Sequence, residues 1–133
     1  MLVFAMDTCS KSATAAILSD EMLLAQVTVN SQKHHSQRMM PLVEQMFDAA
    51  EVAPADIDVF AAAVGPGSFT GVRIGAATVK AMACGGQSAE KNCVAVSTLE
   101  ALAANVPYFS GRSAPDGRSA PDGMSAPDGT VRH

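Results

Sequence analysis

Several short stretches of the sequence carry residue types that could bind a ligand or perform chemistry. The glycine-rich residues 65–68 (GPGS) precede an expected helix, and a glycine turn at a helix N-terminus suits an anion such as phosphate. These residues are not followed by the Gly-Lys-Ser/Thr that completes a P-loop. We therefore interpret them as a tight turn, and Gly71 and Gly75 as positions where a neighbouring helix packs closely.

Four further residues with reactive side chains form no recognisable catalytic or metal-binding pattern. His34 and His35 are adjacent, and adjacent side chains point about 100° apart on a helix and to opposite faces of a strand, so they cannot easily clamp one ion. Cys9 has no His and Asp at a spacing that would activate a thiol. Ser68 does not lie in the G-x-S-x-G elbow of serine hydrolases. The sequence therefore predicts no catalytic residue, no metal site and no cofactor, with Cys9 as a small buried residue.

The elements that would position these residues alternate between strands and helices. Expected strands cover residues 2–6, 12–19, 22–30, 58–64 and 93–96, and expected helices cover residues 37–51, 69–84 and 98–104. Ser36 is the expected cap of the first helix, and Pro41 is expected to make its first turn irregular because proline removes a backbone donor. A three-stranded meander followed by alternating helices and strands predicts an α/β fold of the ribonuclease-H-like kind.

Composition and charge restrict the classes of partner. Hydrophobic residues make up 48% of the chain, but charged residues only 17%, which indicates some apolar surface that another protein covers. The formal net charge of −4 falls entirely on residues 1–109, with six Lys and Arg against ten Asp and Glu. Because nucleic-acid binding depends on basic residues at phosphates, we do not expect this chain to bind RNA well by itself.

Cysteine usage and apolar runs indicate the compartment. The three cysteines form no CxxC, the opening residues 1–6 are too short for a signal peptide, and no apolar run approaches the roughly 20 residues of a membrane span. We therefore expect reduced thiols, a cytoplasmic location and no membrane contact.

The C-terminal part of the chain differs in kind from the rest. Residues 112–129 repeat the unit (Arg/Met)-Ser-Ala-Pro-Asp-Gly three times, and each copy offers one alanine as its apolar content. Such a segment buries too little surface to offset the entropy lost on ordering. We therefore expect one folded domain over residues 1–109 and a disordered repeat tail over residues 110–133.

Four motifs within the expected domain are specific enough to compare with known families. They are AMDT at residues 5–8, HSQRMMPL at 35–42, VGPGSFTGVRIG at 64–75 and VSTLEAL at 96–102. In order and spacing they resemble the bacterial TsaB (YeaZ) family, which is related to the Kae1/TsaD/Gcp, or glycoprotease-like, superfamily. The resemblance covers about residues 1–107, the N-terminal lobe of a family member, and stops where the family continues into a second lobe.

This resemblance implies a single actin-like (ASKHA) lobe and a role as a subunit. Family members are regarded as non-catalytic scaffolds that pair with TsaD, the catalytic subunit, and work with TsaE, an ATPase, in tRNA threonylcarbamoyladenosine biosynthesis. The implied partners are a TsaD-type subunit, a TsaE-type ATPase or a second copy of the chain, with tRNA reached only through the complex. Two alternatives remain open: a small ATP- or metal-dependent enzyme of the same superfamily (kinase or metallopeptidase-like), and a truncated non-functional remnant.

The resemblance also implies that the partner surface lies on the two long helices. Eight residues are the expected contacts: Met39, Val43, Met46 and Phe47 on the first helix, and Val72, Gly75, Val79 and Met82 on the second. A charged substitution such as Val79→Asp is expected to abolish pairing while leaving the sheet largely intact. Asp7 and Thr8 stand where the fold has its first phosphate loop, so they are read either as a vestige of that loop or as an ordinary strand end.

Overall fold

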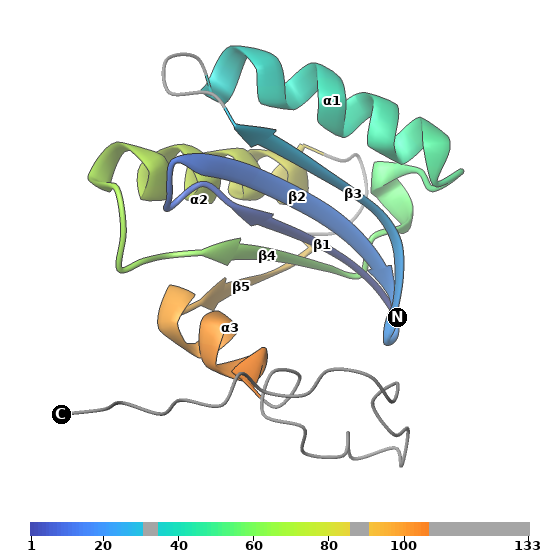
Figure 1. Cartoon of the computed structure of the whole chain (residues 1–133). Helices are drawn as coiled ribbons and strands as arrows, with labels where there is room; N and C mark the ends of the chain where they lie inside the picture. Colours follow the sequence, from blue (N-terminus) through green and yellow to red (C-terminus); the bar gives the residue numbers. More distant parts are fainter. Residues whose placement is uncertain (31–34, 86–90, 107–133) are drawn as a thin grey trace, which may run out of the picture. The chain divides into compact units, whose positions relative to one another are not determined.

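The computed structural model describes residues 1–30, 35–85 and 91–106. The chain divides into two compact units, Met1–Ala101 and Leu102–His133. The first unit contains a five-stranded sheet and two long helices (Figure 1). The tail expected over residues 110–133 lies outside the described residues.

A single mixed sheet organises the first unit. Its strands are β1 (Leu2–Asp7), β2 (Ser12–Ser19), β3 (Met22–Asn30), β4 (Val59–Ala63) and β5 (Asn92–Val96). Their order across the sheet is β3-β2-β1-β4-β5. The first three strands pair antiparallel, which confirms the expected meander, and β4 and β5 add in parallel on the other side of β1.

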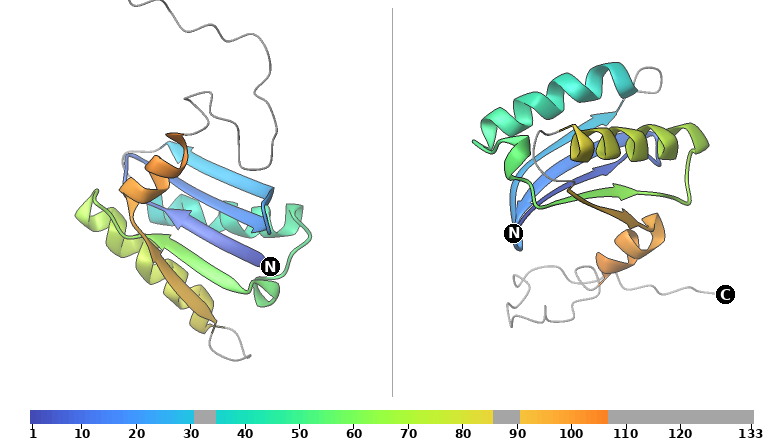
Figure 2. Two further views of the ribbon diagram at one scale, coloured as in Figure 1. Left: turned by 90° about the horizontal axis from the view of Figure 1, so that it is seen from below. Right: turned by 180° about the vertical axis from the view of Figure 1, so that it is seen from behind.

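Two long helices cover one face of this sheet. α1 (His35–Ala49) follows β3, and α2 (Phe69–Cys84) follows β4. Side chains of both helices join one core cluster with buried residues of β1, β2 and β4, so the two helices share a face (Figure 1, Figure 2). A short 3₁₀ helix, Pro54–Asp56, and α3 (Thr98–Ala104) complete the described helices. None of these is both long enough and apolar enough to pass through a lipid bilayer.

The topology confirms the ribonuclease-H-like, actin-like fold class. The meander leads through a helix and back into a strand parallel to β1, and α2 then connects β4 to its own parallel neighbour, β5. Parallel neighbours need such crossovers because a tight turn can join only antiparallel strands. The helical periodicity of both connections is what made this order predictable.

The first helix differs from the expectation at its start. α1 begins at His35 and continues through Pro41 without interruption. The expectation that Ser36 caps the helix is therefore wrong, and so is the expectation of an irregular turn at Pro41. Proline removes one backbone donor, but burial of Met39 and Val43 on either side of it stabilises the helix through tertiary packing.

Aromatic rings of the sheet and α1 form the centre of the core. Phe4 of β1 and Phe60 of β4 are fully buried and are partners in the parallel ladder, with ring centroids 5.9 Å apart. Phe47 of α1 stacks on Phe4 at 5.5 Å. Removing a buried Phe costs about 3–5 kcal/mol, so this contact ties α1 firmly to the sheet.

Six of the eight residues expected at the partner surface are buried inside the lobe itself. They are Met39, Val43, Met46 and Phe47 on α1, and Gly75 and Val79 on α2. The sequence identified the apolar stripes correctly, but the chain's own sheet covers them. The expectation that these side chains are left uncovered is therefore wrong. Val72 and Met82 are half-buried.

The end of β1 lies very close to the first turns of α2. Thr8 is buried and donates its hydroxyl to the carbonyl oxygen of Gly71 at 2.6 Å. A Cβ atom on Gly71 would overlap the carbonyl oxygen of Thr8, and one on Gly75 would lie 2.5 Å from its Oγ1. Glycine is required at both positions because a strand end of the same chain approaches there. The sequence had suggested a neighbouring helix instead.

We expect Gly71→Ala to destabilise the lobe, although alanine is the better helix former. In an open helix the change would stabilise by about 1 kcal/mol. Here the added methyl group overlaps the Thr8 carbonyl, and overpacking of this kind costs about 1–3 kcal/mol. Urea unfolding followed by circular dichroism measures the difference. Ala77→Gly at an exposed position of α2 is the control and should cost about 1 kcal/mol; a Gly71→Ala variant as stable as the parent would contradict the close contact.

We expect Val79→Asp to unfold the lobe instead of leaving the sheet intact. Val79 is 2% exposed, so the substitution places an unpaired carboxylate in the core, at a cost of several kcal/mol or about the whole stability of a small domain. Thermal unfolding by circular dichroism measures this loss. The adjacent control, Lys80→Glu, changes charge by two units at an exposed position and should shift stability by about 0.5 kcal/mol or less. Equal melting temperatures for the two variants would refute the burial of Val79.

Candidate functional site

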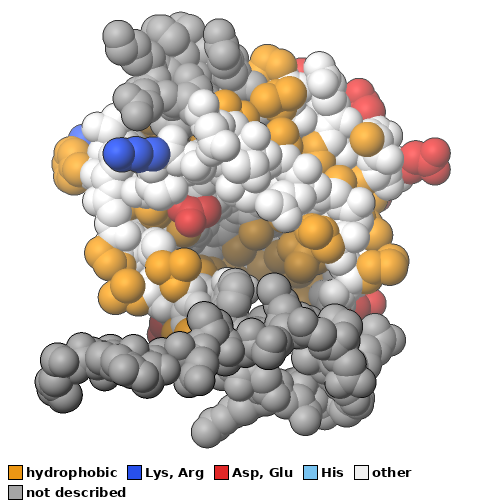
Figure 3. Space-filling view, viewed as in Figure 1, with side chains coloured by type: hydrophobic (Ala, Val, Ile, Leu, Met, Phe, Trp, Pro, Cys, Tyr) orange, Lys and Arg blue, Asp and Glu red, His pale blue; other side chains and the backbone are white. Residues whose placement is uncertain are grey.

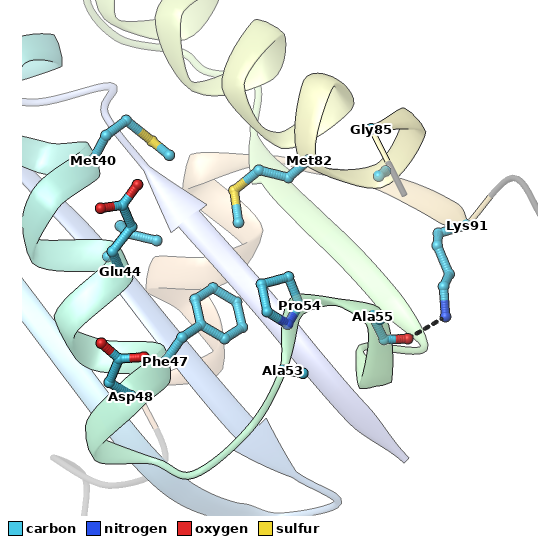
Figure 4. A pocket seen from close by; sticks show the side chains of 12 residues that line it. Met40, Glu44, Phe47, Asp48, Ala53, Pro54, Ala55, Met82, Gly85 and Lys91 are labelled. Atoms are coloured by element: carbon cyan, nitrogen blue, oxygen red, sulfur yellow. Dashed lines mark hydrogen bonds between the residues drawn. The ribbon is translucent and has the colours of Figure 1, made fainter. Parts of the chain in front are cut away.

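A groove of about 580 Å³ opens between α1 and α2 on the helical face of the sheet (Figure 4). One wall is the second half of α1, and the other is the last turn of α2. The chain that leaves α1, at Ala53, Pro54 and Ala55, closes one end. The groove therefore exists because the second half of α1 and the last turn of α2 are too far apart for their side chains to fill the space between them.

The floor and walls of this groove are apolar. Met40 of α1 and Met82 of α2 point toward one another across it, and Phe47 lies beside Pro54 (Figure 4). Both methionines are half-buried, so each residue is partly accessible to solvent. Methionine side chains are flexible and polarizable and adapt to the shape of a partner. The groove is thus suited to an apolar side chain contributed by another molecule.

The rim of the groove carries acidic side chains on α1. Glu44 and Asp48 are four residues apart and exposed, so they lie one turn above the other along the groove. Within the described ranges, neither carboxylate has an ion-pair partner. At the far end, the Lys91 ammonium donates to the carbonyl oxygen of Ala55 at 2.8 Å. A partner that places a basic group beside α1 would meet two free carboxylates.

The sequence-predicted contact residues divide between this groove and the interior. Val43, Phe47 and Met82 line the groove, although only Met82 is more than marginally accessible. The eight expected contacts did not include Met40, Glu44 and Pro54, which also line the groove. The signal for the first two was present, since Met40, Glu44 and Asp48 recur at four-residue intervals beside the buried stripe. A role of any of these residues in partner contact remains a prediction.

Asp7 and Thr8, the predicted remnant of a phosphate loop, form hydrogen bonds with backbone groups of the chain itself. Asp7 Oδ1 accepts from the Cys9 N–H at 2.7 Å, and the Thr8 hydroxyl bonds to Gly71. The Ser68 N–H donates to the Cys9 carbonyl at 2.7 Å, so the loop after β1 is bonded directly to the turn before α2. These bonds are those of a strand end that joins two loops. Any ancestral phosphate contact of Asp7 and Thr8 remains a prediction.

Residues of the GPGS turn and its neighbour Cys9 have structural roles as well. Ser68 Oγ accepts from the Gly71 N–H at 3.2 Å and caps α2. Cys9 is buried as expected, and its thiol donates to the Ala63 carbonyl at 3.4 Å. A Cβ atom on Gly67 would overlap Cys9, which explains why the turn needs glycine there.

The histidines contribute no described side chain to a site. His34 and the side chain of His35 lie outside the described part of the structure, and His35 supplies only the first residue of α1. Among the described residues, no three His, Cys, Asp or Glu side chains lie close enough to hold a metal ion. Charge is also sparse on the surface, where the face in Figure 3 has apolar side chains between few charged ones.

Comparison with known proteins gives the same result from sequence families and from solved structures. Residues 23–120 match the family model described as TsaD, tRNA N6-adenosine threonylcarbamoyltransferase. The tRNA threonylcarbamoyladenosine biosynthesis protein TsaB of Bacillus subtilis (strain 168) is 37% identical over 86% of this chain and 49% of its own length. TsaB of Escherichia coli (strain K12) is 34% identical over 77% of this chain and 43% of its own length.

The fold of the chain is likewise similar to solved YeaZ structures. The crystal structure of an uncharacterized protein with similarity to peptidase YEAZ, from Pseudomonas aeruginosa, superposes with a TM-score of 0.73 at 33% identity, over 83% of this chain and 49% of that one. A structure named YeaZ from the same species gives a TM-score of 0.70 at 33% identity. The chain spans about half the length of the curated relatives that it matches. The family model matches most of the chain, and the curated relatives and the solved structures agree with it. The chain therefore belongs to the TsaB (YeaZ) family of TsaD-like proteins.

Proposed function

We propose that this chain is a non-catalytic scaffold that pairs with a TsaD-type catalytic subunit in tRNA threonylcarbamoyladenosine biosynthesis, the modification of the adenosine beside the anticodon. The observation that carries the proposal is the 37% identity with a relative named for this pathway, over 86% of the chain. The proposal concerns the half of the relatives that the chain spans. It places the contact with TsaD on the helical face of the lobe.

The α1–α2 groove supports this placement better than the buried stripes do. The half-buried Met40 and Met82 offer an apolar site for a helix side chain of the partner. Exposed neighbours along α2 are small, at Ala77 and Ala81, so a partner helix could approach the backbone of α2 closely. An interface of standard size buries about 800 Å² on each partner, which two helices and the groove between them can supply.

Charge supports an indirect route to tRNA. With a net charge of −4, the chain lacks the basic surface that neutralises phosphates and gives most of the affinity for nucleic acid. The tRNA would therefore be bound by the complex and not by this subunit. A TsaE-type ATPase is the proposed third component. A second copy of the chain is the proposed competitor of TsaD, since both would use the same helical face.

We expect Met82→Arg to weaken pairing with a TsaD-type subunit at least about tenfold, which corresponds to loss of one central contact of about 1.4 kcal/mol. The arginine would fill the groove and place its charge beside Glu44 and Asp48, which removes both the apolar seat and the free carboxylates. Calorimetry with the TsaD-type subunit of the same organism measures the affinity. Glu21→Lys, at an exposed position of the turn between β2 and β3, is the charge-changing control and should bind as the parent does. Equal affinity of Met82→Arg and the parent, with circular dichroism unchanged, would exclude the groove from the interface.

We expect the full chain to co-purify with the TsaD-type subunit and to support threonylcarbamoylation of tRNA when TsaE, ATP and the threonylcarbamoyl donor are added. Nucleoside analysis of the tRNA by mass spectrometry gives the readout. Reactions with a full-length TsaB and reactions without either protein provide the two limits. A chain that fails to pair with TsaD while full-length TsaB does so would overturn the proposal. If the chain pairs with TsaD but tRNA is not threonylcarbamoylated, its proposed role would be limited to binding TsaD.

A further inference from the structure

Among the strands that the structure describes, the last one in the sheet has an unpaired edge. β5 pairs with β4 on one side only and is the final strand in the order β3-β2-β1-β4-β5. The Val64 N–H donates to the Val96 carbonyl at 2.9 Å, so the backbone groups of Val96 face β4. Because these groups alternate along a strand, the N–H and C=O groups of Cys93 and Ala95 face the open edge. Within residues 1–30, 35–85 and 91–106, no backbone group pairs with these four, so they can pair with another strand.

A groove of about 540 Å³ runs along this edge beneath α2. Ala76, Lys80 and Cys84 form its wall at four-residue intervals on one flank of the helix, and the exposed strand forms its floor. Cys93 and Ala95 pair with Phe60 and Ala62 of the core, so their side chains lie on the helical face of the sheet. The groove is therefore bounded by a strand edge and a helix. Peptide-binding domains that add a strand to their sheet use the same arrangement.

We propose that this groove binds an extended peptide, which pairs with β5 as a sixth strand and carries alternating apolar and acidic side chains. The proposal does not depend on the function proposed above, because Met82 and Lys80 lie on opposite flanks of α2. Because side chains of a strand alternate between the two faces of a sheet, the acidic side chains would lie beside Lys80 on the helical face and the apolar ones on the opposite face, where Val94 is exposed. The edge itself carries no charge and no proline between Asn92 and Val96, the features with which proteins usually block such pairing.

The charged residues beside the open edge of β5 indicate which kind of strand would pair with it. Lys80 is exposed and, among the described residues, has no carboxylate partner, and Lys91 stands at the start of β5. β5 contains no Asp or Glu, so pairing with β5 of a second copy would offer no carboxylate of that strand to Lys80. A carboxylate on an added peptide strand would instead be attracted to Lys80. The charge pattern therefore favours an acidic peptide over a second copy of this chain.

The test uses the full chain and a fluorescein-labelled octapeptide of alternating valine and glutamate, with binding followed by fluorescence anisotropy at low salt. Ala95→Pro removes an N–H that faces the open edge, and proline is tolerated at such positions, so the β4–β5 ladder is preserved. Its matched control is Ala95→Val, which retains the N–H. We expect Ala95→Pro to bind about fivefold more weakly than Ala95→Val, as expected for loss of one hydrogen bond.

A charge exchange provides the second arm. We expect Lys80→Glu to bind the valine–glutamate peptide about threefold more weakly and to prefer an octapeptide of alternating valine and lysine, as expected for an exposed ion pair. A valine–glutamate peptide with methylated backbone nitrogens should not bind. The proposal is overturned if the peptide does not bind, if the methylated peptide binds equally well, or if folded Ala95→Pro and Ala95→Val bind alike. Sedimentation analysis that finds a dimer abolished by Ala95→Pro would assign the edge to a second copy and also overturn it.

Discussion

The contact between the end of β1 and the first turns of α2 is the constraint on which the rest of the lobe depends. Thr8 reaches the backbone of α2 because Gly71 and Gly75 have no side chains, and its hydroxyl bonds across 63 residues of sequence. This contact fixes the distance between α2 and the sheet. The Ser68–Cys9 backbone bond then fixes the turn that begins the helix. With α2 so placed, the positions of both grooves beside it follow.

α2 separates two surfaces of different chemistry. Toward α1 it presents Met82 to a groove with an acidic rim, and toward β5 it presents Lys80 to a strand edge. The small residues that make up much of the helix leave room on both flanks. A bulkier helix would fill these grooves with its own side chains. The small side chains that give α2 little surface charge therefore also leave an open groove on each of its flanks.

The lobe has a core of its own, although the chain spans about half the length of the relatives that it matches. Phe4, Phe47 and Phe60 pack together from β1, α1 and β4, so the central contacts are made between elements that all lie within the first unit. Both helices that cover one face of the sheet lie within this unit.

The sequence by itself determined the order of strands and helices, the fold class and the family. Period-two and helical spacing identify elements locally, and the GPGS turn with its flanking motif is specific enough to indicate relatives. Only the tertiary structure decided what each apolar stripe touches. An apolar stripe on α1 has the same sequence pattern whether it covers its own sheet or a partner, so the burial of Val43 and Phe47 within the lobe could not be predicted from the sequence. The contact of Gly71 with Thr8 could not be predicted from the sequence either. The two residues are 63 positions apart and meet only in the folded chain, and no local pattern indicates such a contact.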